Sequence, residues 1–130
     1  MASIFTKIIS GEIPSFKVAE NDQFYAFLDV RPVAFGHTLV VPKLEVDYIF
    51  DLEDDLYVDL FLFSKKVAKA LKEEVPCKKI GISVIGLEVP HAHVHLVPIN
   101  AVTDMTFGKS IEVLQSDMLE LSNKLFSKLK

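Results

Sequence analysis

The stretch Pro90-His91-Ala92-His93-Val94-His95-Leu96-Val97-Pro98 alternates histidines with small or apolar residues. Such alternation predicts a strand over His91–Val97, because successive side chains of a strand point to opposite faces of a sheet. The three imidazoles then share one face, and the three intervening side chains share the other, which can pack on a core. The chain holds four histidines in all, so three of them lie in this one segment.

Three interpretations are compatible with such a row of histidines. It can be an imidazole-rich surface without a function, or a zinc site, since alternate histidines of one strand can share a metal ion. It can also be a site of nucleophilic catalysis, because a neutral imidazole is a competent nucleophile near pH 7 and its neighbours can orient it. We favour catalysis at phosphorus, which mainly demands positioning and hydrogen-bond donors.

The rest of the chain predicts an α+β fold. Hydrophobic periodicity, turn residues and prolines predict one short helix, five strands and two long helices. In chain order these are Ser3–Ile9, Phe16–Glu20, Phe24–Asp29, His37–Val41, Asp51–Glu74, Lys79–Ile85, His91–Val97 and Ser110–Leu129. Runs of neighbouring strands favour a mainly antiparallel five-stranded sheet rather than a doubly wound one.

Composition restricts the class of protein. A length of 130 residues fits a single domain, 1–130, and half of the residues are hydrophobic. A net charge of −4 gives no sign of a basic surface for nucleic acid. Cys77 is the only cysteine, which excludes an intramolecular disulfide and suits a reducing compartment. No segment has the length of a membrane span, so we expect a soluble cytoplasmic protein.

Taken together, these motifs resemble the histidine triad (HIT) superfamily, and most closely its Hint-like branch. The family pattern, His-x-His-x-His followed by two apolar residues, is matched in full by residues 91–97. Three further stretches resemble family signatures, namely Ser3–Pro14, Ala26–Pro32 and Gly36–Lys43. The resemblance implies a HIT-like fold whose sheet continues across a homodimer.

The resemblance also implies roles for individual residues. His93 would attack the α-phosphorus and form a nucleotidyl-histidine intermediate, His95 would contact the phosphate oxygens, and His91 would support the nucleophile. His37 matches the fourth active-site histidine, and Asp29 would accept hydrogen bonds from the ribose hydroxyls. The apolar walls around the nucleobase would be Phe5, Ile8, Phe27, Leu28 and Val30. No metal or other cofactor is required by this scheme.

Read from the residues alone, some of these positions have simpler explanations. Asp29 can be a turn-forming residue before Pro32, and His37 can be a structural histidine after Gly36. The wall residues can be ordinary core, because a pocket wall and a core edge look alike in sequence.

The segment before the histidines departs from the family pattern. Hint-like members carry an Asn-x-Gly turn followed by a Gly-Gln stretch, whereas this chain has a shorter turn without the asparagine. Leu87 stands where the family often has glutamine, and Glu88 stands where some members have a hydroxyl residue. A carboxylate near an anionic phosphate costs free energy unless it faces away or takes up a proton. The leaving-group preference therefore stays open.

These observations predict a nucleotide hydrolase or transferase that cleaves purine nucleoside phosphoramidates or related adenylylated compounds. The alternatives are a Fhit-like hydrolase of dinucleoside polyphosphates, a nucleotide-binding or signalling module with weak catalysis, and a zinc-dependent hydrolase. For the homodimer we expect an interface on strand Lys79–Ile85 and helix Asp51–Glu74, to which Leu56, Leu60 or Val84 contributes.

Overall fold

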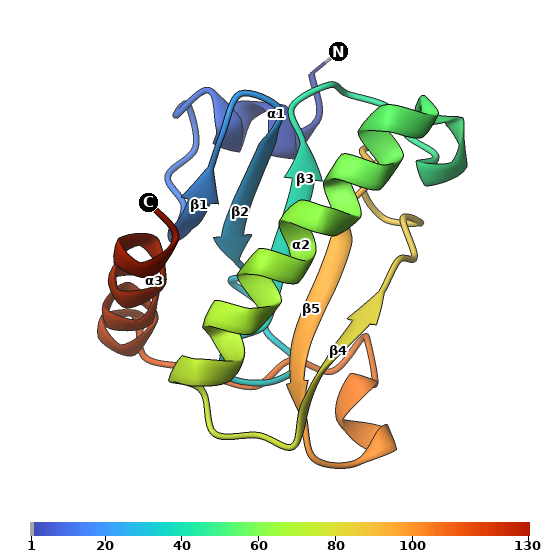
Figure 1. The fold of residues 1–130 in the computed structure, drawn as a ribbon. Coiled ribbons are helices and arrows are strands. Elements are labelled where there is room, and N and C mark those ends of the chain that lie inside the picture. Colours follow the sequence, from blue (N-terminus) through green and yellow to red (C-terminus); the bar gives the residue numbers. More distant parts are fainter. Residues whose placement is uncertain (1) are drawn as a thin grey trace.

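A five-stranded antiparallel sheet is the centre of the computed structural model, which describes residues 2–130 (Figure 1). Met1 lies outside the described residues. The elements are α1 (Ile4–Ile9), β1 (Lys17–Glu20), β2 (Phe24–Leu28), β3 (Thr38–Pro42), the 3₁₀ turn η1 (Ile49–Asp51), α2 (Asp54–Glu74), β4 (Lys79–Ser83), β5 (Val94–Ile99), the 3₁₀ turn η2 (Val102–Met105) and α3 (Gln115–Leu129). The strand order is β1-β2-β3-β5-β4, and every neighbouring pair is antiparallel. The predicted fold class is confirmed.

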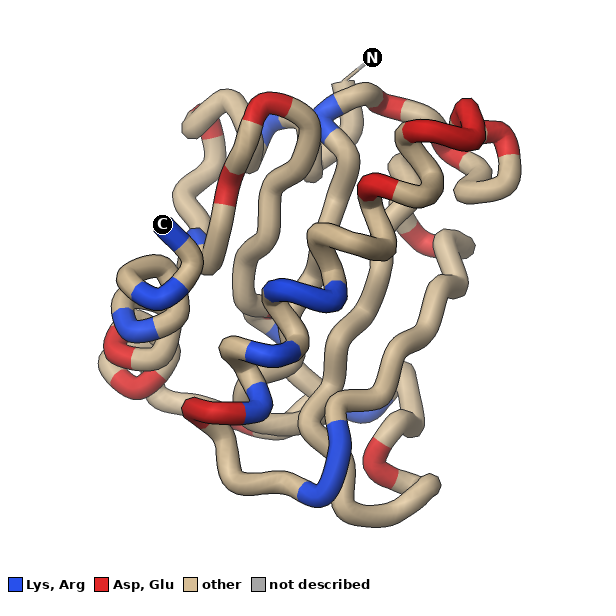
Figure 2. The backbone as a smooth tube through the Cα atoms, viewed as in Figure 1, with Lys and Arg blue, Asp and Glu red and all other residues tan. Residues whose placement is uncertain are grey.

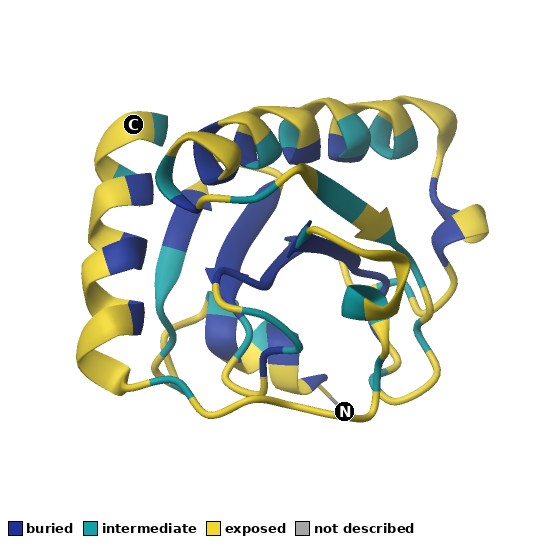
Figure 3. Ribbon diagram, turned by 90° about the horizontal axis from the view of Figure 1, so that it is seen from below, coloured by how far each residue is buried: buried dark blue, intermediate teal, exposed yellow. Residues whose placement is uncertain are grey.

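The main core lies between one face of the sheet and helices α2 and α3. Both helices turn their buried sides toward the strands and their exposed sides outward (Figure 3). Leu60, Val67 and Leu71 of α2 recur at intervals of seven and four residues and are fully buried. Leu60 therefore belongs to the core of the subunit, and the expectation that it contributes to a dimer interface is wrong.

The opposite face of the sheet carries α1 and a second, smaller apolar cluster. The cluster contains Phe5 and Ile8 of α1 and the odd-numbered side chains of two central strands, Tyr25, Phe27, Leu39 and Val41. Ala92, Val94 and Leu96 pack in the main core. Because side chains alternate, the histidines between them face the α1 side of the sheet, as the sequence predicts.

The histidine strand begins later than predicted, at Val94 instead of His91. Its pairing with β3 ends at the Val40–Val94 pair, and Ala92 N–H donates instead to the carbonyl of Val46 at 2.7 Å. The strand also continues through Pro98. That proline lies beyond the last β3 pair, Thr38 with Leu96, so β3 loses no hydrogen bond to its missing N–H.

The two long helices also begin later than predicted. α2 starts at Asp54 rather than Asp51, because Leu52 is extended and anchored in the core. α3 starts at Gln115 rather than Ser110. The chain before it runs extended across the α1 side, where Ile111 N–H donates to the carbonyl of Pro32 at 2.8 Å. β4 ends at Ser83 rather than Ile85.

Charges are segregated along α2 (Figure 2). Acidic residues gather at its amino end, Asp54 and Asp55 among them, and lysines gather toward its carboxyl end. Both biases complement the helix dipole. None of the helices within residues 2–130 is long and apolar enough to cross a membrane.

Candidate active site

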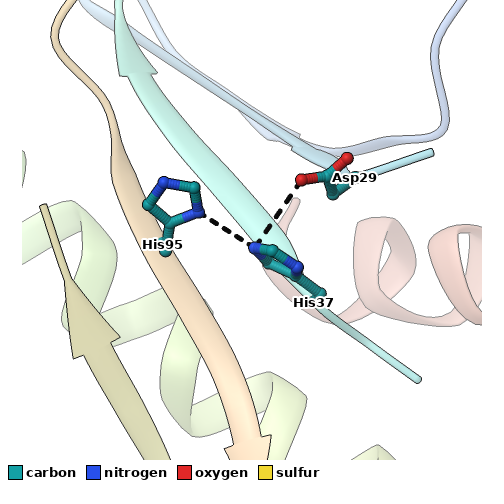
Figure 4. A group of neighbouring side chains, drawn as sticks. All are labelled: Asp29, His37 and His95. Atoms are coloured by element: carbon teal, nitrogen blue, oxygen red, sulfur yellow. Dashed lines mark hydrogen bonds and ion pairs between the residues drawn. The ribbon is translucent and has the colours of Figure 1, made fainter. Parts of the chain in front are cut away.

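Three neighbouring strands bring Asp29, His37 and His95 together on the α1 side of the sheet (Figure 4). Asp29 follows β2 directly and His37 precedes β3 directly, and the Asp29 N–H donates to the His37 carbonyl at 2.9 Å. His95 lies on β5, opposite Leu39 of β3. The His37 Nε2 atom is 3.0 Å from His95 Nδ1 and 3.7 Å from Asp29 Oδ2.

Gly36 makes the approach to His37 possible. Its φ of +93° lies in the left-handed region that side chains disfavour. A Cβ at this position would also lie 3.1 to 3.2 Å from side-chain atoms of Pro98, Val75 and Leu71. The glycine therefore lets the chain turn tightly against the main core before it enters β3.

Hydrogen bonds fix the protonation of the His37–His95 pair. The Val33 N–H donates to His37 Nδ1 at 3.1 Å, so the proton of the neutral His37 ring lies on Nε2. That Nε2–H donates to His95 Nδ1. His95 therefore carries its own proton on Nε2 and offers it as a hydrogen-bond donor.

Backbone carbonyl groups determine which nitrogen carries the proton in the other two histidines, His93 and His91. His93 Nδ1 lies 2.8 Å from the His91 carbonyl, which can only accept, so His93 carries its proton on Nδ1 and a lone pair on Nε2. By the same reasoning His91 donates from Nε2 to the Pro42 carbonyl at 2.7 Å. Its Nδ1 then accepts from the Ser3 hydroxyl, also at 2.7 Å. The arrangement places a ring with a free lone pair beside a ring with a free N–H.

Burial keeps the imidazoles of His37, His93 and His95 neutral. The rings of His93 and His95 lie 4.8 Å apart, and Phe5 packs edge-on against His93 at 4.9 Å. Burial lowers the pKa of His93, although its hydrogen bond to the His91 carbonyl opposes the shift. Burial also lowers the pKa of His37, and it lowers the pKa of His95 to about 3, with help from the neighbouring imidazoles. A nucleophilic lone pair is therefore present at neutral pH.

Asp29, His37 and His95 are also the group whose geometry most resembles a metal site, since one ligand atom of each lies within 4.8 Å of the others. The protonation pattern does not fit a metal there. A metal-bound histidine normally donates from its second nitrogen, whereas His37 Nδ1 accepts from Val33 and leaves its proton on Nε2, the atom nearest the other two ligands. The trio fits a hydrogen-bonded relay better than a zinc site.

The expected nucleobase walls are only partly brought together. Phe5, Ile8 and Phe27 belong to one cluster beside the histidines, and the rings of Phe5 and Phe27 lie 5.6 Å apart. Val30 is at the same end of β2 but is 68 % exposed. Leu28 packs in the main core on the other face of the sheet, so its expected place in the wall is wrong.

Asp29 makes the contact of a turn-forming residue and keeps part of its side chain exposed. Its Oδ1 accepts from the Arg31 N–H at 2.9 Å, which is the turn-forming contact. Its Oδ2 is directed toward His37, and 21 % of the side chain stays exposed. One carboxylate oxygen therefore shapes the turn, and the other remains available to a ligand. Leu87 and Glu88 are both exposed.

Two contacts of the site have no sequence motif. The Phe107 ring, from the segment between η2 and α3, lies 4.7 Å from the His95 ring and 5.9 Å from the His37 ring. Ser3 reaches His91 across 88 positions of sequence. An aromatic residue in a polar loop is a weak signal for the first contact. For the contact between Ser3 and His91, the sequence indicates only that Ser3 can be a helix N-cap.

Comparison with known proteins shows the family to which the chain belongs. The sequence model of the HIT domain matches residues 10–102. Adenosine 5'-monophosphoramidase HNT1 of Saccharomyces cerevisiae is 41 % identical over 98 residues, which are 75 % of this chain and 62 % of the yeast protein. The protein of the same name from Candida albicans is 36 % identical over 137 aligned positions, covering 98 % of this chain and 88 % of that protein.

A solved structure shows the same fold. The crystal structure of a Hit-like protein involved in cell-cycle regulation from Bartonella henselae superimposes with a TM-score of 0.83 at 30 % identity, over 98 % of this chain and 96 % of that one. The family match spans well over half of the sequence and includes all four histidines of the site. The chain therefore belongs to the HIT domain family.

Proposed function

We propose that the protein hydrolyses or transfers the nucleotidyl group of purine nucleoside phosphoramidates or related adenylylated compounds, with His93 as a covalent nucleophile. The observation that carries the proposal is the His93 Nδ1–H bond to the His91 carbonyl, which leaves the Nε2 lone pair free. The monophosphoramidase names of the yeast and Candida relatives support the same substrate class.

In the proposed first step, His93 Nε2 attacks the α-phosphorus and the bond to the leaving amine breaks. The amine departs with the electron pair of that bond and takes up a proton from solvent. In the second step, water attacks the phosphorus, the Nε2–phosphorus bond breaks, and the nucleoside monophosphate leaves with the oxygen of water. His95 Nε2–H donates to a phosphate oxygen, Asp29 accepts from the ribose, and Phe5 and Phe27 contact the base.

The charges around the site favour an amidate over a dinucleoside polyphosphate. Within residues 2–130, the partner of the Asp29 carboxylate is the neutral His37 ring at 3.7 Å, and no lysine or arginine forms a salt bridge with that carboxylate. A polyphosphate leaving group brings several negative charges, which the neutral rings of His37, His93 and His95 do not offset, whereas an amine brings none. Rates on both substrates at equal concentration distinguish the two activities.

The decisive experiment is mass spectrometry of the protein quenched after brief exposure to an adenosine phosphoramidate. We expect an adduct of one adenylyl group on the peptide that contains His93, and none on His93→Asn. The asparagine amide keeps a donor close to the position of Nδ1, so the His91 carbonyl stays satisfied. Absence of an adduct on the native chain in single-turnover conditions would refute covalent catalysis and leave a nucleotide-binding module.

The proposal includes one domain over residues 1–130 and a homodimer. α3 lies beyond the residues that match the family model, yet it packs on β1 and α2. β4 is an edge strand of the sheet, and its Ile82 is 51 % exposed. An unpaired apolar edge is suited to pairing with a second copy. Light scattering at micromolar concentration is expected to give the dimer mass for the native chain and the monomer mass for Ile82→Lys.

A further inference from the structure

We propose that Ser3, itself held by Glu45, is a positioning residue for the nucleophile: its hydroxyl anchors the His91 ring, and the His91 carbonyl in turn orients His93. The inference rests on the proposed role of His93 as nucleophile. It adds a residue from the start of the chain and one from the loop after β3 to a site otherwise built from the sheet.

The backbone at His91 needs such an anchor. β5 begins only at Val94, so the carbonyl that accepts from His93 lies outside the sheet ladder. Its position is set by the neighbouring Ala92 N–H bond to Val46 and by the fully buried His91 ring. Both nitrogens of that ring are bonded, Nε2 to the Pro42 carbonyl and Nδ1 to the Ser3 hydroxyl. The ring thus fixes the carbonyl from two sides.

The direction of the Ser3 hydrogen bond follows from its surroundings. The Ser3 oxygen accepts from the Thr6 N–H at 3.1 Å, which is the N-cap bond of α1. The Thr6 hydroxyl donates to Glu45 Oε1 at 2.7 Å. It lies 3.4 Å from the Ser3 oxygen, too far for a good hydroxyl bond, whereas His91 Nδ1 lies at 2.7 Å. The Ser3 proton therefore goes to His91.

Glu45 holds Ser3 in place through the Ser3 backbone N–H, not through the hydroxyl that contacts His91. Its Oε1 accepts from the Ser3 backbone N–H at 2.6 Å as well as from the Thr6 hydroxyl. Hydrogen bonds to the carboxylate stabilise its charged form. Glu45 follows Pro42, the residue whose carbonyl accepts from His91, by three positions. The last residue of β3 and the loop that follows it thus support the two sides of the His91 ring.

An N-cap role alone does not require this arrangement. Capping uses the Ser3 oxygen as an acceptor and places no demand on the hydroxyl proton. Glycine is tolerated at an N-cap almost as well as serine. Ser3→Gly therefore removes the donor to His91 and largely spares α1.

The test compares rates of nucleotidyl transfer to His93 in single turnovers. We expect Ser3→Gly to slow adduct formation on the order of 10-fold to 100-fold, because small displacements of a nucleophile have effects of that size. Ser3→Thr keeps the hydroxyl and is expected to restore most of the rate. Ser10→Ala, which removes a side-chain bond at the other end of α1, is the matched control and is expected to react at the native rate.

A second readout needs no substrate. In ¹⁵N spectra of the imidazoles, native His93 is expected to carry its proton on Nδ1, and Ser3→Gly is expected to populate both tautomers. Should Ser3→Gly fail to fold, Glu45→Ala carries the same test, because it frees Ser3 but keeps the hydroxyl and the cap. A native rate together with a native His93 spectrum in the folded variant would overturn the proposal. If the native chain forms no adduct, the proposed function fails, while the spectra still decide whether Ser3 sets the tautomer.

Discussion

Acidification from pH 7.5 to pH 5.0 is expected to destabilise the fold, because the site buries the neutral imidazoles of His37, His93 and His95. Burial lowers the pKa of His95 to about 3 in the folded protein, from its ordinary value of 6.5. The unfolded chain therefore binds more protons than the folded one between these values, so stability falls as pH falls through that window. At pH 5.0 the loss is about 2 kcal/mol for His95 alone, since each unit of pKa corresponds to about 1.36 kcal/mol. Partial solvation of the ring reduces this to about 1–2 kcal/mol.

The neighbouring histidines act in the same direction. Burial also lowers the pKa of His37 and His93, so both add to the loss. The carboxylates of Glu20 and Glu45 have pKa values below 4.5, so they stay largely ionised at pH 5.0. The pH window from 7.5 to 5.0 therefore includes little change in the charge of these two carboxylates.

The assay is urea unfolding at pH 7.5 and pH 5.0 for the native chain and for His95→Gln. The difference in the free energy of unfolding between the two pH values is expected to shrink by about 1–2 kcal/mol in the variant. Val67→Ala, a truncation in the main core, is the control: it lowers stability at both pH values and leaves their difference unchanged. Equal stability of the native chain at the two pH values would refute the account of the buried, neutral site.

Three further substitutions test individual contacts. His37→Ala removes the donor to His95 Nδ1 and is expected to slow adduct formation at least about tenfold. The effect should be smaller than the roughly 100- to 1,000-fold loss that follows removal of a catalytic donor itself. An unchanged rate in single turnovers would exclude the relay. Gly36→Ala puts a side chain at φ +93° against the core and is expected to cost about 1–3 kcal/mol in urea unfolding, whereas a native midpoint would show that the turn relaxes freely. Asp29→Asn keeps an oxygen for the turn but loses the charge, so calorimetry is expected to show about tenfold weaker binding of adenosine monophosphate. A 2',3'-dideoxy analogue should bind native and variant chains equally, and a difference there would argue against the ribose contact.

The sequence predicts the elements and the face of the sheet that carries the histidines, because both depend on local periodicity. Its errors fall where a long-range contact overrides a local pattern. Ser110–Leu114 has helical periodicity but runs extended, with Ile111 bound to Pro32 on a different part of the chain. His91 and Ala92 continue the alternation of a strand, yet they leave the ladder because Ala92 bonds Val46 instead.

The same distinction applies to the site. The His-x-His-x-His spacing indicates three of its rings, and the resemblance adds His37 and Asp29, which the sheet brings within 3.7 Å of each other. The prediction that Leu28 lines the nucleobase wall is wrong, because Leu28 follows Phe27 in β2 and its side chain therefore faces the opposite side of the sheet. Nothing local indicated that Ser3, a helix N-cap, would also donate to a histidine.

In the proposed mechanism, the neutral rings allow nucleophilic attack on an anionic substrate. A protonated cluster would attract phosphate more strongly, but it would have no lone pair with which to attack. The structure instead fixes the position of each ring proton through groups that do not take part in the reaction. The His91 carbonyl holds the His93 proton on Nδ1. The Val33 N–H holds the His37 proton on Nε2, and His37 in turn leaves the His95 proton on Nε2. Such fixed dipoles provide a lone pair and a donor side by side without reorganisation during the reaction. Burial lowers the pKa of these rings, so both groups stay in their working form at neutral pH.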